Sequence, residues 1–194
     1  MFSAIEKDIH RTFANGHPFQ EPLRNVLTAF AIRNPNLLYC QGMNYVVAYF
    51  LINSLGEEET FWIMNCLVEN ILPDDYFKDL STISITTQIF SDVLPYLFPD
   101  MGREMKNIGM DCSLFIVSWY VCLFTKGFIN SVSAYLLTKL ILERRNHSFG
   151  FVLLKLSLGV IAAILGRDEP FAFKPEFSAF RDKFELSVFE ISLL

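Results

Sequence analysis

The chain has 194 residues, of which 16 are Lys or Arg and 21 are Asp or Glu, so its formal net charge is −5. This acidic balance argues against a basic surface for nucleic acid, and an apolar fraction of 52% with 19% charged residues excludes a disordered chain. The length and composition predict one domain, or two small subdomains that share a core.

The high apolar content raises the alternative of a polytopic membrane protein. A helix that spans a bilayer needs about 20 mostly apolar residues. The apolar run at 112–125 is bounded by Asp111 and Lys126 and is too short, and the run at 149–166 contains Lys155. We therefore expect two buried helices here and no integral membrane segment.

The cysteines and histidines form no recognisable ligand or disulfide motif. None of the four cysteines belongs to a C-x-x-C pair, which favours reduced core thiols in a cytoplasmic protein: Cys40, Cys66, Cys112 and Cys122. The three histidines stand singly in the sequence, so we expect no metal site.

Helical signals recur along the chain, whereas the alternation typical of strands does not. Ser3 with Glu6 predicts a capping box at the start of a helix that ends before Gly16. Further helices are expected near residues 21–34, 43–55, 57–72, 83–94, 99–109, 114–124, 130–145 and 148–165. We expect Pro95 to interrupt the helix at 83–94.

Two details of this scheme concern individual side chains. Asn130 or Ser131 is expected to cap the helix that follows it. Trp62 and Trp119 have apolar neighbours and are expected in the core. The scheme predicts an all-α fold of about nine or ten helices with short connections.

The last 28 residues, 167–194, carry a separate pattern. A stripe of large apolar residues is spaced 3, 4, 4 and 3 apart, which is typical of an amphipathic helix: Phe177, Phe180, Phe184, Val188 and Ile191. We expect this Phe-rich C-terminal helix either to seal the core or to bind a further protein partner.

Two short motifs carry candidate chemistry. In the first, Ile5, Asp8 and Arg11 are three apart and share one helical face, where Asp8 can hold the guanidinium of Arg11. The second, at 39–42, places Gln41 in a loop before an apolar helix, beside free backbone amides that favour an anion. The simpler alternatives are a surface ion pair for the first motif and an ordinary polar residue at a helix start for the second.

Taken together and in this order, IEKDIHR at 5–11 and YCQG at 39–42 resemble the I-x-x-D-x-x-R and Y-x-Q signatures of the TBC domain, the GTPase-activating module for Rab-type small GTPases. The segments at 33–44, 57–62, 71–77 and 113–124 also look like that family. The resemblance implies a TBC-type helical domain in two subdomains over residues 1–166, lacking the N-terminal part of the domain, and a helical tail over 167–194.

The same resemblance implies an activity. Arg11 would act as an arginine finger and Gln41 as a glutamine finger, both supplied in trans to accelerate GTP hydrolysis on a Rab-type GTPase. Four residues would support these fingers: Asp8, Tyr39, Gly42 and Asn44. Asn44 would stabilise the glutamine loop or cap the helix after it.

Because the GTPase carries GTP and Mg²⁺, the resemblance implies that the chain itself binds no cofactor. It also implies a cytoplasmic protein of vesicle trafficking that reaches membranes through its GTPase. The alternative is a TBC-like pseudo-enzyme that serves as a scaffold in a larger assembly, which the short N-terminus favours. Partner choice is distributed over the binding surface, so the sequence does not identify the GTPase.

Overall fold

The computed structural model describes residues 2–37 and 39–166. In these residues the chain forms nine α-helices and a π-helical segment and contains no strand, so the predicted all-α fold is confirmed. The elements are α1 (Phe2–Thr12), α2 (Gln20–Arg33), α3 (Met43–Ile52), α4 (Glu57–Cys66), η1 (Leu67–Ile71), α5 (Ser81–Leu97), α6 (Pro99–Asn107), α7 (Ser113–Val121), α8 (Asn130–Glu143) and α9 (Phe149–Ile164). The Phe stripe predicted at 177–191 lies outside the described residues.

The start of α1 differs from the prediction. This helix already begins at Phe2, so Ser3 lies within its first turn and the predicted capping box is wrong. Glu6 instead accepts a hydrogen bond from Nε of Arg24 in α2, with 2.7 Å between Nε and Oε1. This ion pair links α1 to α2 at the surface.

The prediction that Pro95 interrupts its helix is also wrong, because α5 continues to Leu97. Pro95 lacks the N–H that would bond to the carbonyl of Ser91, one turn earlier, yet the helix continues for two residues beyond it. Pro95 also packs against α6. A Cβ added to Gly102 of that helix would lie 2.7 Å from the Cβ of Pro95.

The predicted cap of α8 is wrong as well. Asn130 is the first residue of the helix, and no side chain caps its start. The side chain of Asn130 instead donates a hydrogen bond from its Nδ2 to Oδ1 of Asn53, at the end of α3, at 2.9 Å. A tertiary contact has therefore replaced the local one that the sequence favours.

Several side chains differ from their predicted depth. Trp62 is 52% exposed, because it lies on the outer face of α4, where the guanidinium of Arg33 covers its ring at 5.4 Å from the centroid. Trp119 packs against the core as predicted. All four cysteines are free thiols, but Cys40 is half-buried and Cys66 is exposed, so the predicted core position holds for Cys112 and Cys122 alone. Leu114 of α7 is 74% exposed, so that helix is buried on one side only.

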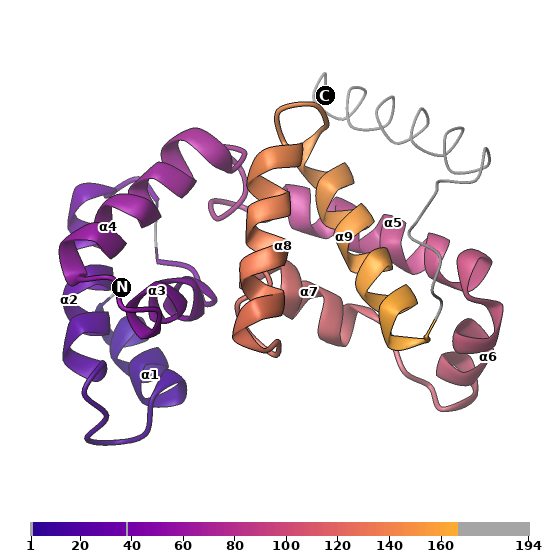
Figure 1. The fold of residues 1–194 in the computed structure, drawn as a ribbon, viewed down its shortest axis with the longest axis horizontal. Coiled ribbons are helices and arrows are strands. Elements are labelled where there is room, and N and C mark those ends of the chain that lie inside the picture. Colours follow the sequence, from indigo (N-terminus) through magenta and orange to yellow (C-terminus); the bar gives the residue numbers. More distant parts are fainter. Residues whose placement is uncertain (1, 38, 167–194) are drawn as a thin grey trace.

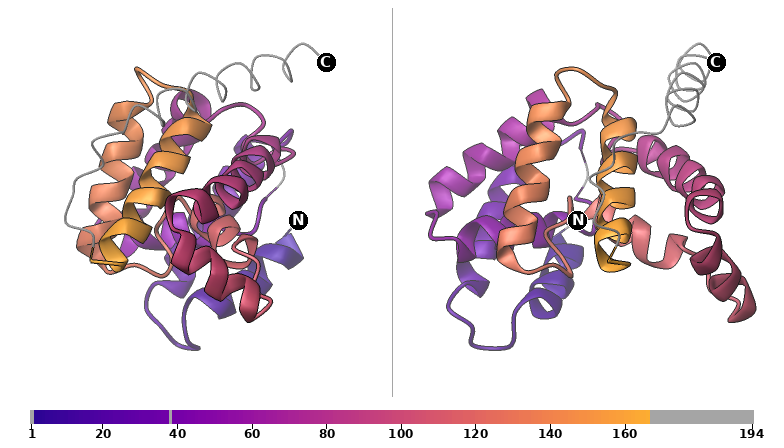
Figure 2. Two further views of the ribbon diagram at one scale, coloured as in Figure 1. Left: turned by 90° about the vertical axis from the view of Figure 1, so that its right-hand side faces the viewer. Right: turned by 45° about the vertical axis from the view of Figure 1, so that its right-hand side comes forward.

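The described helices pack as two groups (Figure 1). In the first group α2 contacts α1, α3 and α4, and in the second group α5 contacts α6, α7 and α9, while α8 packs on α9. Figure 1 and the right-hand view of Figure 2 show α8, in orange, as the helix of the second group that lies beside the first group.

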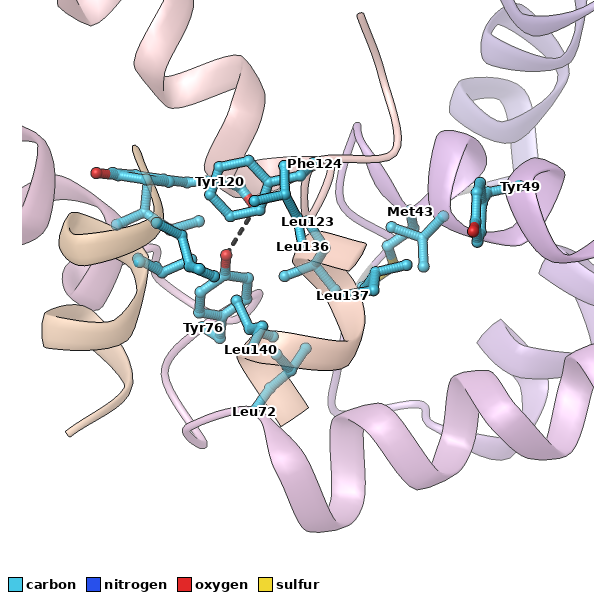
Figure 3. Packing of buried hydrophobic residues seen from close by; sticks show 14 of the residues in the cluster. Met43, Tyr49, Leu72, Tyr76, Tyr120, Leu123, Phe124, Leu136, Leu137 and Leu140 are labelled. Carbon is cyan, nitrogen blue, oxygen red and sulfur yellow. Dashed lines mark hydrogen bonds between the residues drawn. The ribbon is translucent and has the colours of Figure 1, made fainter. Parts of the chain in front are cut away.

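One core of buried apolar side chains extends through both groups. Figure 3 shows Met43, from the start of α3, in the same cluster as Leu136 and Leu137 of α8. The hydroxyl of buried Tyr76, which follows η1, donates to the backbone carbonyl of Tyr120 in α7 at 2.6 Å (Figure 3). The shared core therefore fixes the start of α3 relative to the end of α7, and the candidate glutamine loop precedes α3 directly.

Among the described residues, no helix combines the length and the apolar character that a bilayer crossing requires. The two apolar runs discussed above form α7, with 9 residues, and α9, with 16 residues. Most side chains of α9 are buried in the core.

Candidate functional site

Arg11 lies at the C-terminal end of α1. Its side chain is 62% exposed, whereas the side chain of Asp8, one turn earlier, is only 6% exposed. Nη1 of Arg11 donates a hydrogen bond to Oδ1 of Asp8 at 3.1 Å. Ile5 and Ile9 are buried in the core, so the helix under Arg11 is anchored while its guanidinium faces solvent.

The carboxylate of Asp8 connects the two motifs. Its second oxygen, Oδ2, accepts a hydrogen bond from the hydroxyl of Tyr39 at 2.8 Å. Burial, reinforced by the hydrogen bond and the negative charge of Asp8, raises the pKa of Tyr39 far above its ordinary value. Tyr39 therefore remains a protonated donor at neutral pH, and Asp8 receives one bond from each motif.

The glutamine loop rests directly on α7. Gly42 has a φ of +117°, which is strained for residues with a side chain. A Cβ at this position would lie 2.3 Å from Cγ1 of Val121 and 2.9 Å from its carbonyl oxygen. Glycine thus lets the backbone of the loop approach the end of α7, while the neighbouring Gln41 is exposed.

The carboxamide of Asn44 spans from the loop to α1. Its Oδ1 accepts the backbone N–H of Gly42 at 2.9 Å, and its Nδ2 donates to Oγ1 of Thr12 at 2.7 Å. The N-cap residue of α3 is Gly42 and Asn44 lies inside the helix, so Asn44 does not occupy the N-cap position. The hydrogen bonds of Asn44 hold the glutamine loop against α1 instead.

Hydrogen bonds connect five of the six residues singled out from the sequence, and the sixth, Gln41, directly precedes Gly42 in the loop. Asp8 and Arg11 form an ion pair, Tyr39 binds the same carboxylate, and the remaining three residues form the loop and the start of α3: Gln41, Gly42 and Asn44. Among the described residues, no side chain forms a hydrogen bond with the carboxamide of Gln41. Arg11 donates to Asp8 from one of its guanidinium nitrogens, Nη1.

Three residues around the site were missed from the sequence. Thr12 follows Arg11 directly, so its position next to the first motif could have identified it from the sequence. Val121 and Lys126 have no local signal, since they approach the loop only in the folded chain. Nζ of Lys126 lies 4.5 Å from the ring centroid of Tyr45, in the first turn of α3, and adds a positive charge near the loop.

The arrangement can neutralise negative charge and orient a polar ligand. Arg11 offers a permanent cation with N–H donors that no described residue accepts, and Gln41 offers a carboxamide that can both donate and accept. In the described part of the chain, no group of three or more His, Cys, Asp or Glu side chains is placed to hold a metal ion.

Replacement of Gly42 by alanine is expected to destabilise the fold. The positive φ costs about 1 to 2 kcal/mol for a side chain, and overlap with Val121 adds about 1 to 3 kcal/mol. Gly127 has a φ of +86° but open space around its Cβ position, so Gly127→Ala isolates the backbone contribution.

Urea denaturation of both variants measures the difference. We expect a clearly larger loss of unfolding free energy for Gly42→Ala than for Gly127→Ala. Equal losses would show that the contact with Val121 imposes no constraint on the loop.

Comparisons with known proteins agree with this geometry. A family model described as the Rab-GTPase-TBC domain matches residues 1–164. Growth hormone-regulated TBC protein 1 of Homo sapiens is 33% identical over 129 residues, which are 62% of this chain and 38% of the relative. TBC1 domain family member 2A of Rattus norvegicus is 33% identical over 136 residues, which are 66% of this chain and 15% of the relative. The chain therefore spans less than two fifths of the length of these relatives.

Proposed function

The chain belongs to the Rab-GTPase-TBC domain family, and we propose that it accelerates GTP hydrolysis on a Rab-type small GTPase by supplying Arg11 and Gln41 in trans. One observation carries this proposal. The buried carboxylate of Asp8 binds both the exposed Arg11 and the hydroxyl of Tyr39, which lies two residues before the exposed Gln41. A cation and a carboxamide are therefore presented to solvent from one connected framework.

Arg11 suits the neutralisation of charge in phosphoryl transfer. The transferred phosphoryl group spreads negative charge over its oxygens, and catalysis consists largely of stabilising that charge and positioning the attacking water. The planar guanidinium can bridge two oxygens, which the point charge of a lysine cannot do. The hydrogen bond that Arg11 donates to Asp8 limits the freedom of the arginine side chain before the partner binds, which lowers the cost of ordering it.

Gln41 suits the orientation of the attacking water. A carboxamide oxygen accepts a hydrogen bond from water while the amide nitrogen can donate to a neighbouring oxygen. The hydrogen bond between Gly42 and Asn44 and the contact of Gly42 with Val121 hold the backbone beside Gln41. The side chain of Gln41 therefore extends from a well-ordered backbone. The GTPase would carry the nucleotide and its Mg²⁺, and the chain would reach membranes in the cytoplasm through this partner, as a regulator of vesicle trafficking.

Single-turnover GTP hydrolysis across a panel of Rab-type GTPases, with and without the full chain, tests the proposal. We expect at least one GTPase to be accelerated by about 10³-fold or more, which is the range for an arginine finger. A GTPase outside the Rab type serves as the control and should not respond.

The same panel separates the activator from the scaffold. A pseudo-enzyme would bind a GTPase in its GTP state and leave its hydrolysis rate unchanged. Binding without acceleration across the whole panel would contradict the proposed activity and favour the scaffold.

A further inference from the structure

Thr12 lies between the arginine helix and the glutamine loop. Its Oγ1 donates a hydrogen bond to the backbone carbonyl of Asp8 at 2.6 Å and accepts one from Nδ2 of Asn44 at 2.7 Å. Oδ1 of Asn44 in turn accepts the backbone N–H of Gly42 at 2.9 Å. These three bonds form a continuous relay from the turn that carries Arg11 to the residue after Gln41.

The single proton of the hydroxyl gives this relay a direction. Because a carbonyl can only accept, Thr12 must donate its proton to Asp8, and its oxygen is left to accept from Asn44. The Nδ2 of Asn44 therefore faces Thr12, and its Oδ1 faces the N–H of Gly42. With the carboxamide turned over, Nδ2 would oppose the N–H of Gly42 and two donors would face each other. Thr12 thus selects the orientation in which Asn44 holds the loop.

A threonine at a helix end often bonds to the carbonyl four residues earlier, so that bond alone indicates no special role. Thr86 of α5 makes the same type of bond, to the carbonyl of Thr82 at 2.7 Å. Thr12 differs because its oxygen also accepts from Asn44, 32 residues away, which is 1% exposed. A buried amide that loses its acceptor is costly, so the cross-link constrains Asn44 strongly.

We propose that Thr12 is a positioning residue whose hydroxyl orients Asn44 and thereby sets the glutamine loop relative to the helix that carries Arg11. The relay concerns the chain alone, whereas its effect on catalysis rests on the proposed function. Thr12 itself touches neither nucleotide nor water in this scheme.

Hydrogen exchange of the Gly42 amide, measured by NMR on the full chain, tests the relay without any GTPase. Thr12→Val keeps the shape of the side chain and removes the hydroxyl, so we expect exchange at Gly42 to accelerate about tenfold, as for the loss of one buried hydrogen bond. Thr12→Ser keeps the hydroxyl and should retain the protection. Thr86→Val, the matched control, should leave Gly42 unchanged.

Three results would overturn the relay: unchanged exchange in Thr12→Val, equal acceleration in Thr86→Val, or lost protection in Thr12→Ser. If Thr12→Val fails to fold, Thr12→Ala and Thr12→Ser give the same comparison between a lost and a retained hydroxyl.

Stimulated hydrolysis at a saturating concentration of chain provides the second measurement. We expect Thr12→Val to lower the rate about tenfold in the otherwise unchanged chain and to have no further effect in a Gln41→Ala background. An equal loss in both backgrounds would overturn the assignment to the glutamine loop. Fast exchange at Gly42 in Thr12→Val, combined with no stimulation by the unmodified chain, would reject the proposed function and leave the relay standing.

Discussion

Replacement of Arg11 by alanine or by lysine is expected to lower the stimulated hydrolysis rate about 10³-fold or more and to leave thermal unfolding almost unchanged. The activity falls because no other group replaces the charge at the transferred phosphoryl group, and lysine lacks the fork that bridges two oxygens. The loss of stability is small because the side chain of Arg11 is 62% exposed, and because the buried carboxylate of Asp8, which loses this partner, keeps the hydrogen bond from Tyr39.

Arg103 offers a matched control for this experiment. It pairs with Asp100 at the same i, i+3 spacing on α6, and its side chain is 71% exposed. Single-turnover hydrolysis and thermal unfolding of Arg11→Ala, Arg11→Lys and Arg103→Ala should show a loss of activity for the first two variants only. If Arg11→Lys kept most of the activity, the guanidinium fork would not be required.

Replacement of Gln41 by alanine is expected to lower the stimulated rate about 10²-fold or more, with a smaller effect on binding of the GTPase. The carboxamide would act on the attacking water chiefly in the transition state, so its loss affects the rate constant more than the affinity. The side chain of Gln41 is exposed and forms no hydrogen bond with another described residue, so we expect no change in stability.

The control for this variant is Gln88→Ala. Gln88 is an exposed glutamine of α5 whose amide binds Asp92 at 3.2 Å. Hydrolysis rates measured over a range of chain concentrations separate the maximal rate from the apparent affinity. If Gln41→Ala kept the maximal rate and lost only affinity for the GTPase, Gln41 would be a binding contact and not a catalytic residue.

The helices were largely predictable, since apolar periodicity and helix-ending residues such as Gly16 are local features of the sequence. Their ends were less predictable where a tertiary contact competed with a local one. Asn130, for example, bonds to Asn53 instead of capping α8. Pro95 marks the last turn of α5 and packs on α6, a role that depends on which helix lies beside it.

The candidate site was predictable as far as its two motifs. Asp8 and Arg11 are one helical turn apart, so their pairing follows from spacing alone. The bond between Tyr39 and Asp8, and the contact of Gly42 with Val121, join segments far apart in the sequence and could not be read from spacing. Thr12 has an ordinary local bond, and only its partner on α3 distinguishes it.

The most direct test of the account uses a GTPase whose own catalytic glutamine has been replaced by leucine. If Gln41 supplies the carboxamide in trans, single-turnover GTP hydrolysis by this GTPase is still accelerated by the unmodified chain and is not accelerated by Gln41→Ala. No acceleration by the unmodified chain, with the intact GTPase still responding, would contradict the glutamine finger and leave Arg11 as the sole contribution in trans.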